Sequence, residues 1–320
     1  MVVFDFFDRE KIIKALSDLY NIDIETIRNI DNSFFETDNL TYDFVKTFGI
    51  DLENTSVEDV FLRCKHITTT IDDFNSLKKF GIQPLNSLLE IQHSAIFQFL
   101  HNHGIKFNLL ERYFIYKGIK IYLIKPDEKC IECFYNGECR YTENIFGEAP
   151  SNYALNDLCE YRDSIRQLVT TLYYDNGEIE VHLSGNNLYN YSCVKECPEF
   201  IFLIDKLISD LFDDNSTILA DWIKATNNQF HCLSFNQNIF SFHTLAEKPY
   251  YHNEWYNDFF EFCDENISCL DDLNGNFFAN TFLIENSIAT LLNQNNSHYG
   301  QLKQSVSIPF SNIEIHSYFR

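Results

Sequence analysis

The sequence predicts an α+β protein, because segments with the apolar pattern of strands are interspersed with segments of helical periodicity. Residues 60–64 combine β-branched, aromatic and small side chains, as buried strands do. Two alternating apolar runs within residues 112–123 are joined by Lys117-Gly118, which predicts a β-hairpin. Residues 8–20 place isoleucine and leucine at helical spacing. With 320 residues the chain is long enough to bury a substantial core.

A helical leader is predicted for residues 1–54. Acidic residues stand at the start of the helix predicted at 8–20, where the helix dipole favours them, and residues 24–30 are expected to add a second helix. The amino terminus is acidic where a signal peptide needs basic residues, and charges interrupt every apolar run that might span a membrane. We therefore expect a cytoplasmic protein without membrane contact, whose 10 cysteines are thiols or metal ligands.

The most informative motif begins where the strand at 60–64 ends. His66 and Thr68 lie two residues apart, so they are expected to leave the strand on one face. Thr70 is predicted to cap the amino terminus of a short helix, and Gly81 is predicted to end it, because glycine enters the left-handed conformation without steric cost. This layout suits a nucleotide-binding site.

The motif resembles the start of the ADP-ribosyltransferases of the diphtheria-toxin and poly(ADP-ribose)-polymerase type, a clan that includes DNA-modifying bacterial toxins. In that family a histidine and a hydroxyl residue two positions on are followed by an aromatic, an aliphatic and a glycine-aliphatic pair. The counterparts in this chain are His66, Thr68, Phe74, Leu77, Gly81 and Ile82. The gap before Phe74 is one residue longer than in the family, and Ile67 stands where the family usually has glycine.

The resemblance implies a split antiparallel β core and NAD as a substrate. It also implies that His66 hydrogen-bonds the adenosine-side ribose and acts in catalysis, and that Thr68 helps to position the nicotinamide amide. Nicotinamide leaves the ribose through an oxocarbenium-like species, so such a site needs a stacking aromatic and a carboxylate near the ribose 2-hydroxyl. Tyr113 or Tyr116 of the hairpin is the expected stacking residue, the other packing in the core. The alternative for His66 is a strand-end histidine bonded to a carbonyl.

Glu199 is the first candidate for the catalytic carboxylate. It precedes a run of apolar residues and follows a proline, as an acid at the head of a buried strand would. The same residues also fit a helix over 200–211, with Glu199 in its first turn beside the positive end of the helix dipole. Glu314, at the head of a predicted terminal strand, is the reserve candidate.

A cysteine-rich insertion is predicted at residues 125–160. Two thiolates separated by two residues can hold one ion, and four sulfurs complete a closed zinc site, so a structural zinc is expected on Cys130, Cys133, Cys139 and Cys159. Cys193 or Cys197 is an alternative fourth ligand. The other interpretation is that all of these residues are reduced thiols.

A formal net charge of −23 disfavours nucleic acid as the main partner and favours a basic protein surface. We expect an ADP-ribosyltransferase that modifies a macromolecule, in the setting of a toxin or phage-defence effector. Its core would span residues 55–206, and residues 207–320 would complete or flank that core. The alternative is a non-enzymatic acidic interaction protein, such as an antitoxin, inhibitor or scaffold, that binds a basic partner.

Overall fold

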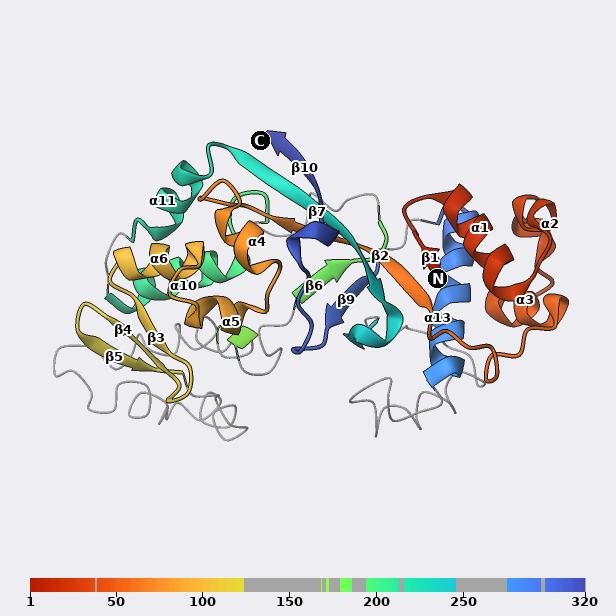
Figure 1. The fold of residues 1–320 in the computed structure, drawn as a ribbon, viewed down its shortest axis with the longest axis horizontal. Coiled ribbons are helices and arrows are strands. Elements are labelled where there is room, and N and C mark those ends of the chain that lie inside the picture. The colour runs from red at the N-terminus through yellow and green to blue at the C-terminus, as the bar shows by residue number, and fades with distance from the viewer. Residues whose placement is uncertain are drawn as a thin grey trace, which may run out of the picture.

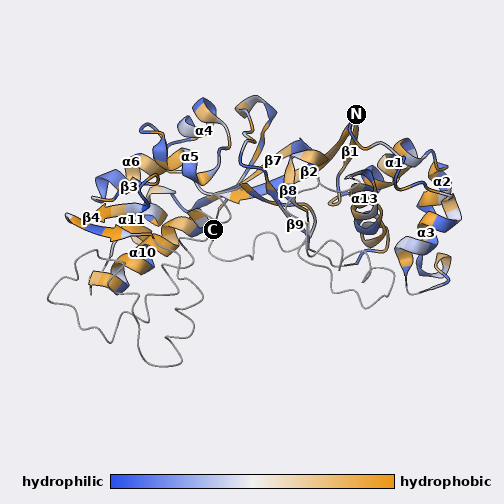
Figure 2. Ribbon diagram, turned by 90° about the horizontal axis from the view of Figure 1, so that it is seen from below, coloured by the Kyte–Doolittle hydropathy of each residue, from blue (hydrophilic) through white to orange (hydrophobic). Residues whose placement is uncertain are grey.

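The computed structural model combines helices with a largely antiparallel sheet, which agrees with the predicted α+β class. A seven-stranded sheet lies between two groups of helices (Figure 1), and Figure 2 shows the same three-part arrangement from below. The structure describes residues 1–37, 39–123, 168, 171–172, 179–185, 194–212, 216–245, 275–294 and 297–319.

The central sheet has the strand order β10-β7-β2-β6-β9-β8, and β1 also pairs with β2. Only the β1–β2 pairing is parallel among the described strands. Strand β2 pairs with β7 along one edge, and β1 and β6 share its other edge. The pairing of β6 with β2 places His182 opposite Lys65. The strands are β1 (Val2–Phe4), β2 (Val60–Thr68), β6 (Ile179–His182), β7 (Gln229–Asn238), β8 (Phe242–Thr244), β9 (Tyr299–Leu302) and β10 (Glu314–Phe319).

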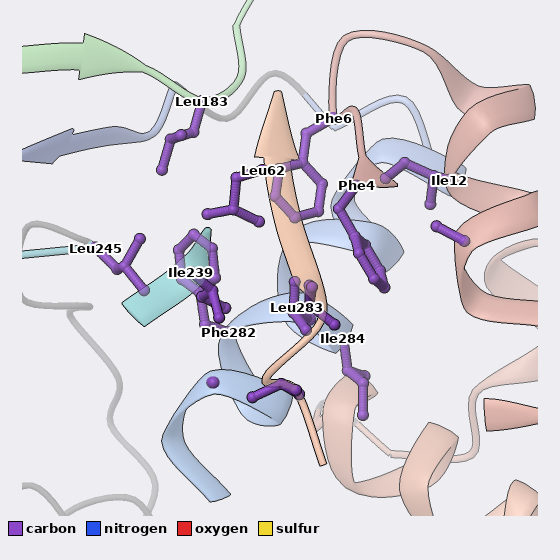
Figure 3. Packing of buried hydrophobic residues seen from close by; sticks show 14 of the residues in the cluster. Phe4, Phe6, Ile12, Leu62, Leu183, Ile239, Leu245, Phe282, Leu283 and Ile284 are labelled. Atoms are coloured by element: carbon purple, nitrogen blue, oxygen red, sulfur yellow. The ribbon is translucent and has the colours of Figure 1, made fainter. Parts of the chain in front are cut away.

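The first helical group consists of α1 (Arg9–Tyr20), α2 (Ile24–Arg28), α3 (Leu40–Phe48) and α13 (Gly275–Leu291), with a short 3-10 helix at Asn32–Phe34. The helices predicted at 8–20 and 24–30 are thus present. The larger core lies where α1 and α13 meet the sheet, and Figure 3 shows Phe4, Leu62 and Leu283 packed there, all fully buried. The amino-terminal helices therefore share one core with α13, from the other end of the chain.

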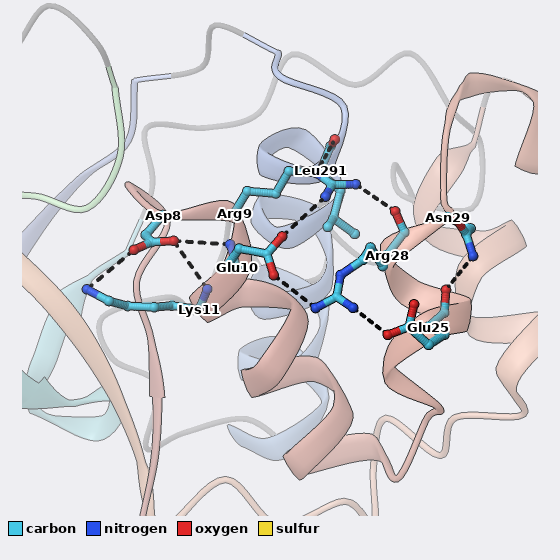
Figure 4. A network of polar contacts seen from close by, with 8 residues as sticks. All are labelled: Asp8, Arg9, Glu10, Lys11, Glu25, Arg28, Asn29 and Leu291. Carbon is cyan, nitrogen blue, oxygen red and sulfur yellow. Dashed lines mark hydrogen bonds and ion pairs between the residues drawn. The ribbon is translucent and has the colours of Figure 1, made fainter.

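Polar contacts hold the first helical group together at its surface (Figure 4). The Arg9 guanidinium donates to the carbonyl oxygens of Arg28, at 2.9 Å, and of Leu291, at 3.3 Å. Arg28 in turn pairs with Glu10 at 3.0 Å. The Asp8 side chain caps α1 by accepting from two backbone amides of its first turn. These contacts tie α1 and α2 to the carboxyl end of α13.

The second helical group packs against a small three-stranded sheet to form a second core. The predicted hairpin is present in that sheet, and its turn residues Lys117 and Gly118 both have positive φ, at 49° and 81°, as two-residue hairpin turns require. The elements are α5 (Leu85–Glu90), α6 (Ala95–Asn102), α10 (Glu199–Phe212), α11 (Ile218–Ala225), β3 (Lys106–Asn108), β4 (Tyr113–Tyr116) and β5 (Ile119–Tyr122). Helix α4 (Asn75–Phe80) lies beside this group, and its Leu77 packs against the larger core.

The start of α4 differs from the prediction. Thr70 does not cap the helix, which begins only after Phe74, a residue with φ of 63°. Asp72 takes the capping role, because its carboxylate accepts from the Ser76 amide at 2.7 Å, while the Thr70 hydroxyl donates to the other oxygen of Asp72 at 2.8 Å. The hydrogen bonds from Thr70 and Ser76 to Asp72 therefore order the segment between β2 and α4, which has one residue more than the family pattern.

Gly81 ends α4 as predicted, with φ of 72°. The next residue, Ile82, forms an isolated antiparallel bridge with Ile308 through hydrogen bonds of 2.9 and 3.0 Å. A Cβ atom at Gly81 would lie 2.1 Å from the Ile308 carbonyl oxygen. Glycine is required here because the carboxyl-terminal part of the chain passes directly against this turn.

No helix in the described ranges is both long enough and apolar enough to cross a bilayer.

Candidate functional site

A cavity of about 320 Å³ lies between the central sheet and the second helical group. This volume is at the lower end of the range typical of small-molecule sites. Its wall includes the end of β2, the segment leading into α4, strand β6, the first turn of α10 and parts of α4, α5, α6 and α11. Its apolar lining includes Phe74, Leu77, Leu85, Leu88, Phe200 and Trp222.

Strand β2 brings His66 and Thr68 to this cavity. Alternate residues of the strand, Leu62 and Cys64 among them, are fully buried in the larger core. His66 and Thr68 continue the same face beyond the edge of that core, where they line the cavity. The two residues lie on one face, as predicted, but the strand continues through both of them instead of ending at residue 64.

The ring of His66 has a defined hydrogen-bonding state. Its Nδ1 atom lies 2.8 Å from the carbonyl oxygen of Glu180. A carbonyl oxygen only accepts, so Nδ1 carries the proton, and Nε2 is the acceptor of the neutral ring. Packing around the imidazole lowers the pKa of His66 below its ordinary value, so the ring is neutral at pH 7. His66 thus has the carbonyl partner that the alternative interpretation expects, and the same residue also lines the cavity.

His182 is a second imidazole in the cavity wall, which sequence reasoning missed. It lies at the end of β6, opposite Lys65 of β2, and is 7% exposed. Burial lowers the pKa of His182 to about 4, and the neighbouring His66 and Lys65 act in the same direction. Only the pairing of β6 with β2 brings this residue to the site, and no local pattern signals that pairing.

Hydroxyl groups line the side of the cavity next to α4, α6 and α11. Thr69 accepts a hydrogen bond from the indole of Trp222 at 2.8 Å, which joins the end of β2 to α11. The Ser76 hydroxyl accepts from the Ala95 amide at 2.7 Å and so joins α4 to α6. Ser94 caps α6 and is fully buried. The wall is thus cross-linked by its own polar side chains.

Glu199 lines the same cavity, but from a helix. It is the first residue of α10 and is exposed, so the strand prediction is wrong and the helical alternative is correct. The reason is that the apolar residues after Glu199 recur at a spacing that buries one helical face in the second core. The structure consequently brings His66, Thr68 and Glu199 to one cavity, which Asp72 and Glu180 also line.

Neither hairpin tyrosine lines the cavity. Tyr116 is buried in the second core, its ring centre 5.1 Å from that of Phe212. The Tyr113 hydroxyl accepts from the Asn108 amide at 3.2 Å, and the ammonium of Lys120 lies 3.8 Å from the Tyr113 ring centre. Among the described residues, the cavity is instead lined by the aromatic side chains Phe74, Phe200 and Trp222.

Glu314 also lies away from the cavity. It is the first residue of β10, as its predicted strand position requires, and its carboxylate forms an ion pair with Arg63 that lowers its pKa. Glu314 is not among the residues that line the cavity.

The predicted zinc ligands Cys130, Cys133, Cys139 and Cys159, and the alternative Cys193, lie outside the described residues. Cys197 is buried in the second core. Within the described ranges, no group of three or more histidine, cysteine or carboxylate residues has the arrangement of a metal site. The zinc site stays a prediction.

In comparisons with known proteins, no family model, curated protein or solved structure matches this chain.

Proposed function

We propose that the chain is an NAD-dependent ADP-ribosyltransferase that modifies a macromolecule, with NAD bound at the described cavity. The observation that supports this proposal is the meeting of His66, Thr68 and Glu199 at one cavity, from β2 and α10. These are the imidazole, hydroxyl and carboxylate that the short sequence resemblance implies for NAD. The apolar, aromatic lining and the volume of the cavity suit a flat heterocycle with an attached sugar.

The proposed chemistry assigns a role to each group. The unprotonated Nε2 of His66 accepts a hydrogen bond from a hydroxyl of the adenosine-side ribose, and the Thr68 hydroxyl bonds the nicotinamide amide. Glu199 accepts from the ribose 2-hydroxyl and stabilises the positive charge that develops on the ribose. The bond between ribose C1 and nicotinamide breaks with its electron pair on the nicotinamide nitrogen. A nucleophile of the target then forms the new bond to C1, and its proton passes to the carboxylate.

The stacking role passes to other residues in this proposal. Trp222 lines the cavity, and its hydrogen bond to Thr69 fixes the position of its indole. Offset stacking on such a ring stabilises a bound heterocycle by about 0.5–1.5 kcal/mol beyond its burial. Tyr113 and Tyr116 would reach NAD only if the small sheet moved, and we assign them no contact with it.

Transfer of label from NAD to macromolecules of a cell extract tests the proposal. The purified chain is incubated with NAD labelled in its adenine half, and released nicotinamide is measured in parallel. Glu199→Gln is expected to abolish both signals. Glu196→Gln is the matched control, because Glu196 is also exposed and is not among the residues that line the cavity. Loss of both signals in Glu314→Gln, with Glu199→Gln unaffected, would move the catalytic role to the reserve candidate.

A non-enzymatic acidic interaction protein is the second candidate. The net charge of −23 favours it, because such a chain attracts basic protein surfaces without any chemistry. This alternative predicts no nicotinamide release with any extract, and binding to a basic partner that weakens steeply as salt is raised. The two candidates therefore differ in one direct measurement.

A further inference from the structure

Strand β10 is the outermost strand on one side of the central sheet in the described ranges, and its far edge points away from β7. Figure 1 shows its arrow at the upper margin of the molecule, beside the carboxyl terminus. We propose that β10 pairs antiparallel with β10 of a second copy of the chain, so that the central sheet continues across a symmetric dimer. None of the β10 residues lines the cavity, so this dimer does not depend on the proposed reaction.

The edge of β10 lacks the usual features that prevent strand addition. Edge strands are commonly very short, bulged, or interrupted by lysine or proline. In contrast, β10 pairs with β7 at six consecutive residues without a register shift, and Glu314–Phe319 contains neither lysine nor proline. All of its residues are exposed except Ile315, which is half-buried. The edge is therefore long and regular enough to accept another strand.

Contacts with β7 already hold β10 in its extended form. The Tyr318 ring stacks on that of Phe230, with the ring centres 5.2 Å apart. The Ser317 hydroxyl lies 3.0 Å from Nδ1 of His231, which stands opposite it in the register. A strand that is ordered before binding loses little conformational entropy when its main chain pairs with a second strand.

The sequence of this edge is chemically self-complementary about Ser317. When two copies of residues 314–320 run antiparallel with Ser317 opposite its counterpart, acid faces base, apolar faces apolar and ring faces ring. The pairs, each formed twice by symmetry, are Glu314 with Arg320, Ile315 with Phe319, and His316 with Tyr318. Pairs of these kinds directly opposite one another stabilise antiparallel strands. A shift by one residue would place Glu314 opposite Phe319 and remove the match of charges.

Two exposed side chains gain most from this pairing. Phe319 is 77% exposed, so its contact with Ile315 of the second copy removes apolar area from water. Glu314 is 63% exposed although it pairs with Arg63, so its carboxylate can also meet Arg320 of the second copy.

Two general effects set the strength and the size of the assembly. The formal net charge of −23 on each copy opposes association, but charges more than about 8 Å apart are largely screened at physiological salt. The two-fold arrangement uses the β10 edge of both copies, so the assembly closes at two chains.

Sedimentation velocity of the full chain tests the proposal. It is measured at physiological salt between roughly 1 and 300 μM, a range in which so small an interface is expected to dissociate. We expect a dimer fraction that rises with concentration and no larger species. Phe319→Glu should weaken the dimer about tenfold or more, because a carboxylate then faces Ile315 in both symmetric pairs. Leu110→Glu is the matched control, since Leu110 is 93% exposed in the turn between β3 and β4 and receives the same charge change.

A cysteine at the two-fold axis tests the register. Residues directly opposite in antiparallel strands have Cα atoms about 4.5–5.5 Å apart, which lies within the reach of a disulfide. Ser317→Cys should therefore give a covalent dimer on oxidation with copper phenanthroline. Ser311→Cys, an exposed position before β10, should give no more covalent dimer than the wild type.

Three results would each overturn the proposal. They are a wild-type chain that stays monomeric at the highest concentration, a dimer that Phe319→Glu weakens no more than Leu110→Glu, and cross-linking of Ser317→Cys that does not exceed that of Ser311→Cys. Circular dichroism checks that each variant is folded, and the wild-type sedimentation measurement needs no variant.

Discussion

Replacing Gly81 with alanine should destabilise the protein far more than the same change at another helix end. Gly81 has φ of 72° and ψ of −166°, a region that costs a residue with a side chain about 1–3 kcal/mol. The new methyl group would also meet the Ile308 carbonyl, so the backbone must move and the two hydrogen bonds between Ile82 and Ile308 weaken. At about 0.5–1.5 kcal/mol for each bond, the whole effect comes to roughly 2–6 kcal/mol.

Gly49 provides the matched control for this prediction. It also ends a helix, α3, with φ of 62° and ψ of 38°, but a Cβ atom there would have no neighbour within 4 Å. Gly49→Ala should therefore lose only about 1–2 kcal/mol, the backbone cost of the left-handed conformation.

Urea denaturation followed by circular dichroism measures both variants. Amide hydrogen exchange at Ile82 and Ile308 should become faster in Gly81→Ala and stay unchanged in Gly49→Ala. If Gly81→Ala is no less stable than Gly49→Ala, the contact with Ile308 does not constrain this turn, and the reasoning fails.

Four further predictions concern other parts of the chain. The pKa of His182, about 4, lies below the value of about 6.5 in an unfolded chain, so the unfolded state binds the proton more tightly and stability falls as pH drops from about 6.5 to 4. His182→Gln should reduce this loss of unfolding free energy by up to roughly 3 kcal/mol, as measured by denaturation at a series of pH values. If the variant loses stability with falling pH as steeply as the wild type, the burial of the ring is contradicted. The pH dependence has the opposite direction at Glu285 of α13. Burial raises the pKa of Glu285 to about 7, so stability falls as pH rises from about 4.5 to 7. Glu285→Gln should therefore gain up to about 3 kcal/mol at pH 8 and little at pH 4, and equal effects at both pH values would refute the assignment. Trp222→Phe should cost about 1–3 kcal/mol by leaving the buried Thr69 hydroxyl without its donor, and a purely additive effect with Thr69→Val would exclude the coupling. Finally, if the predicted zinc site exists, metal analysis should find about one zinc per chain, which Cys133→Ser releases; a metal-free wild type would remove that prediction.

Local patterns were sufficient to predict the elements whose side chains alternate or recur within a few residues. The strand at residues 60–64, the hairpin at Lys117-Gly118 and the first helices all follow from such patterns. The structure contains each of them, with the strand extended to Thr68. The apolar run after Glu199 fits strand and helix equally well on paper, and only its packing in the second core decides for the helix.

The remaining parts of the site depend on contacts between distant residues. His182 reaches the cavity through a single register pair with β2, and Trp222 reaches it through a hydrogen bond to Thr69. Neither partner is signalled by neighbouring sequence, since both contacts join residues more than one hundred positions apart. The placement of the hairpin in a separate small sheet also depends on contacts that local sequence does not signal. Because of this placement, Tyr113 and Tyr116 do not line the cavity.

Two of the three side chains assigned to the proposed reaction, His66 and Glu199, belong to elements that are anchored in different cores. The strand that carries His66 is rooted in the larger core with the first helices, while Glu199 opens a helix rooted in the smaller one. The distance between His66 and Glu199 therefore depends on how the part of the molecule around the larger core packs against the part around the second core. Substitutions deep in either half, remote from any bound molecule, are expected to alter catalytic rate by shifting that fit, so a screen for activity should recover such positions beside the cavity residues.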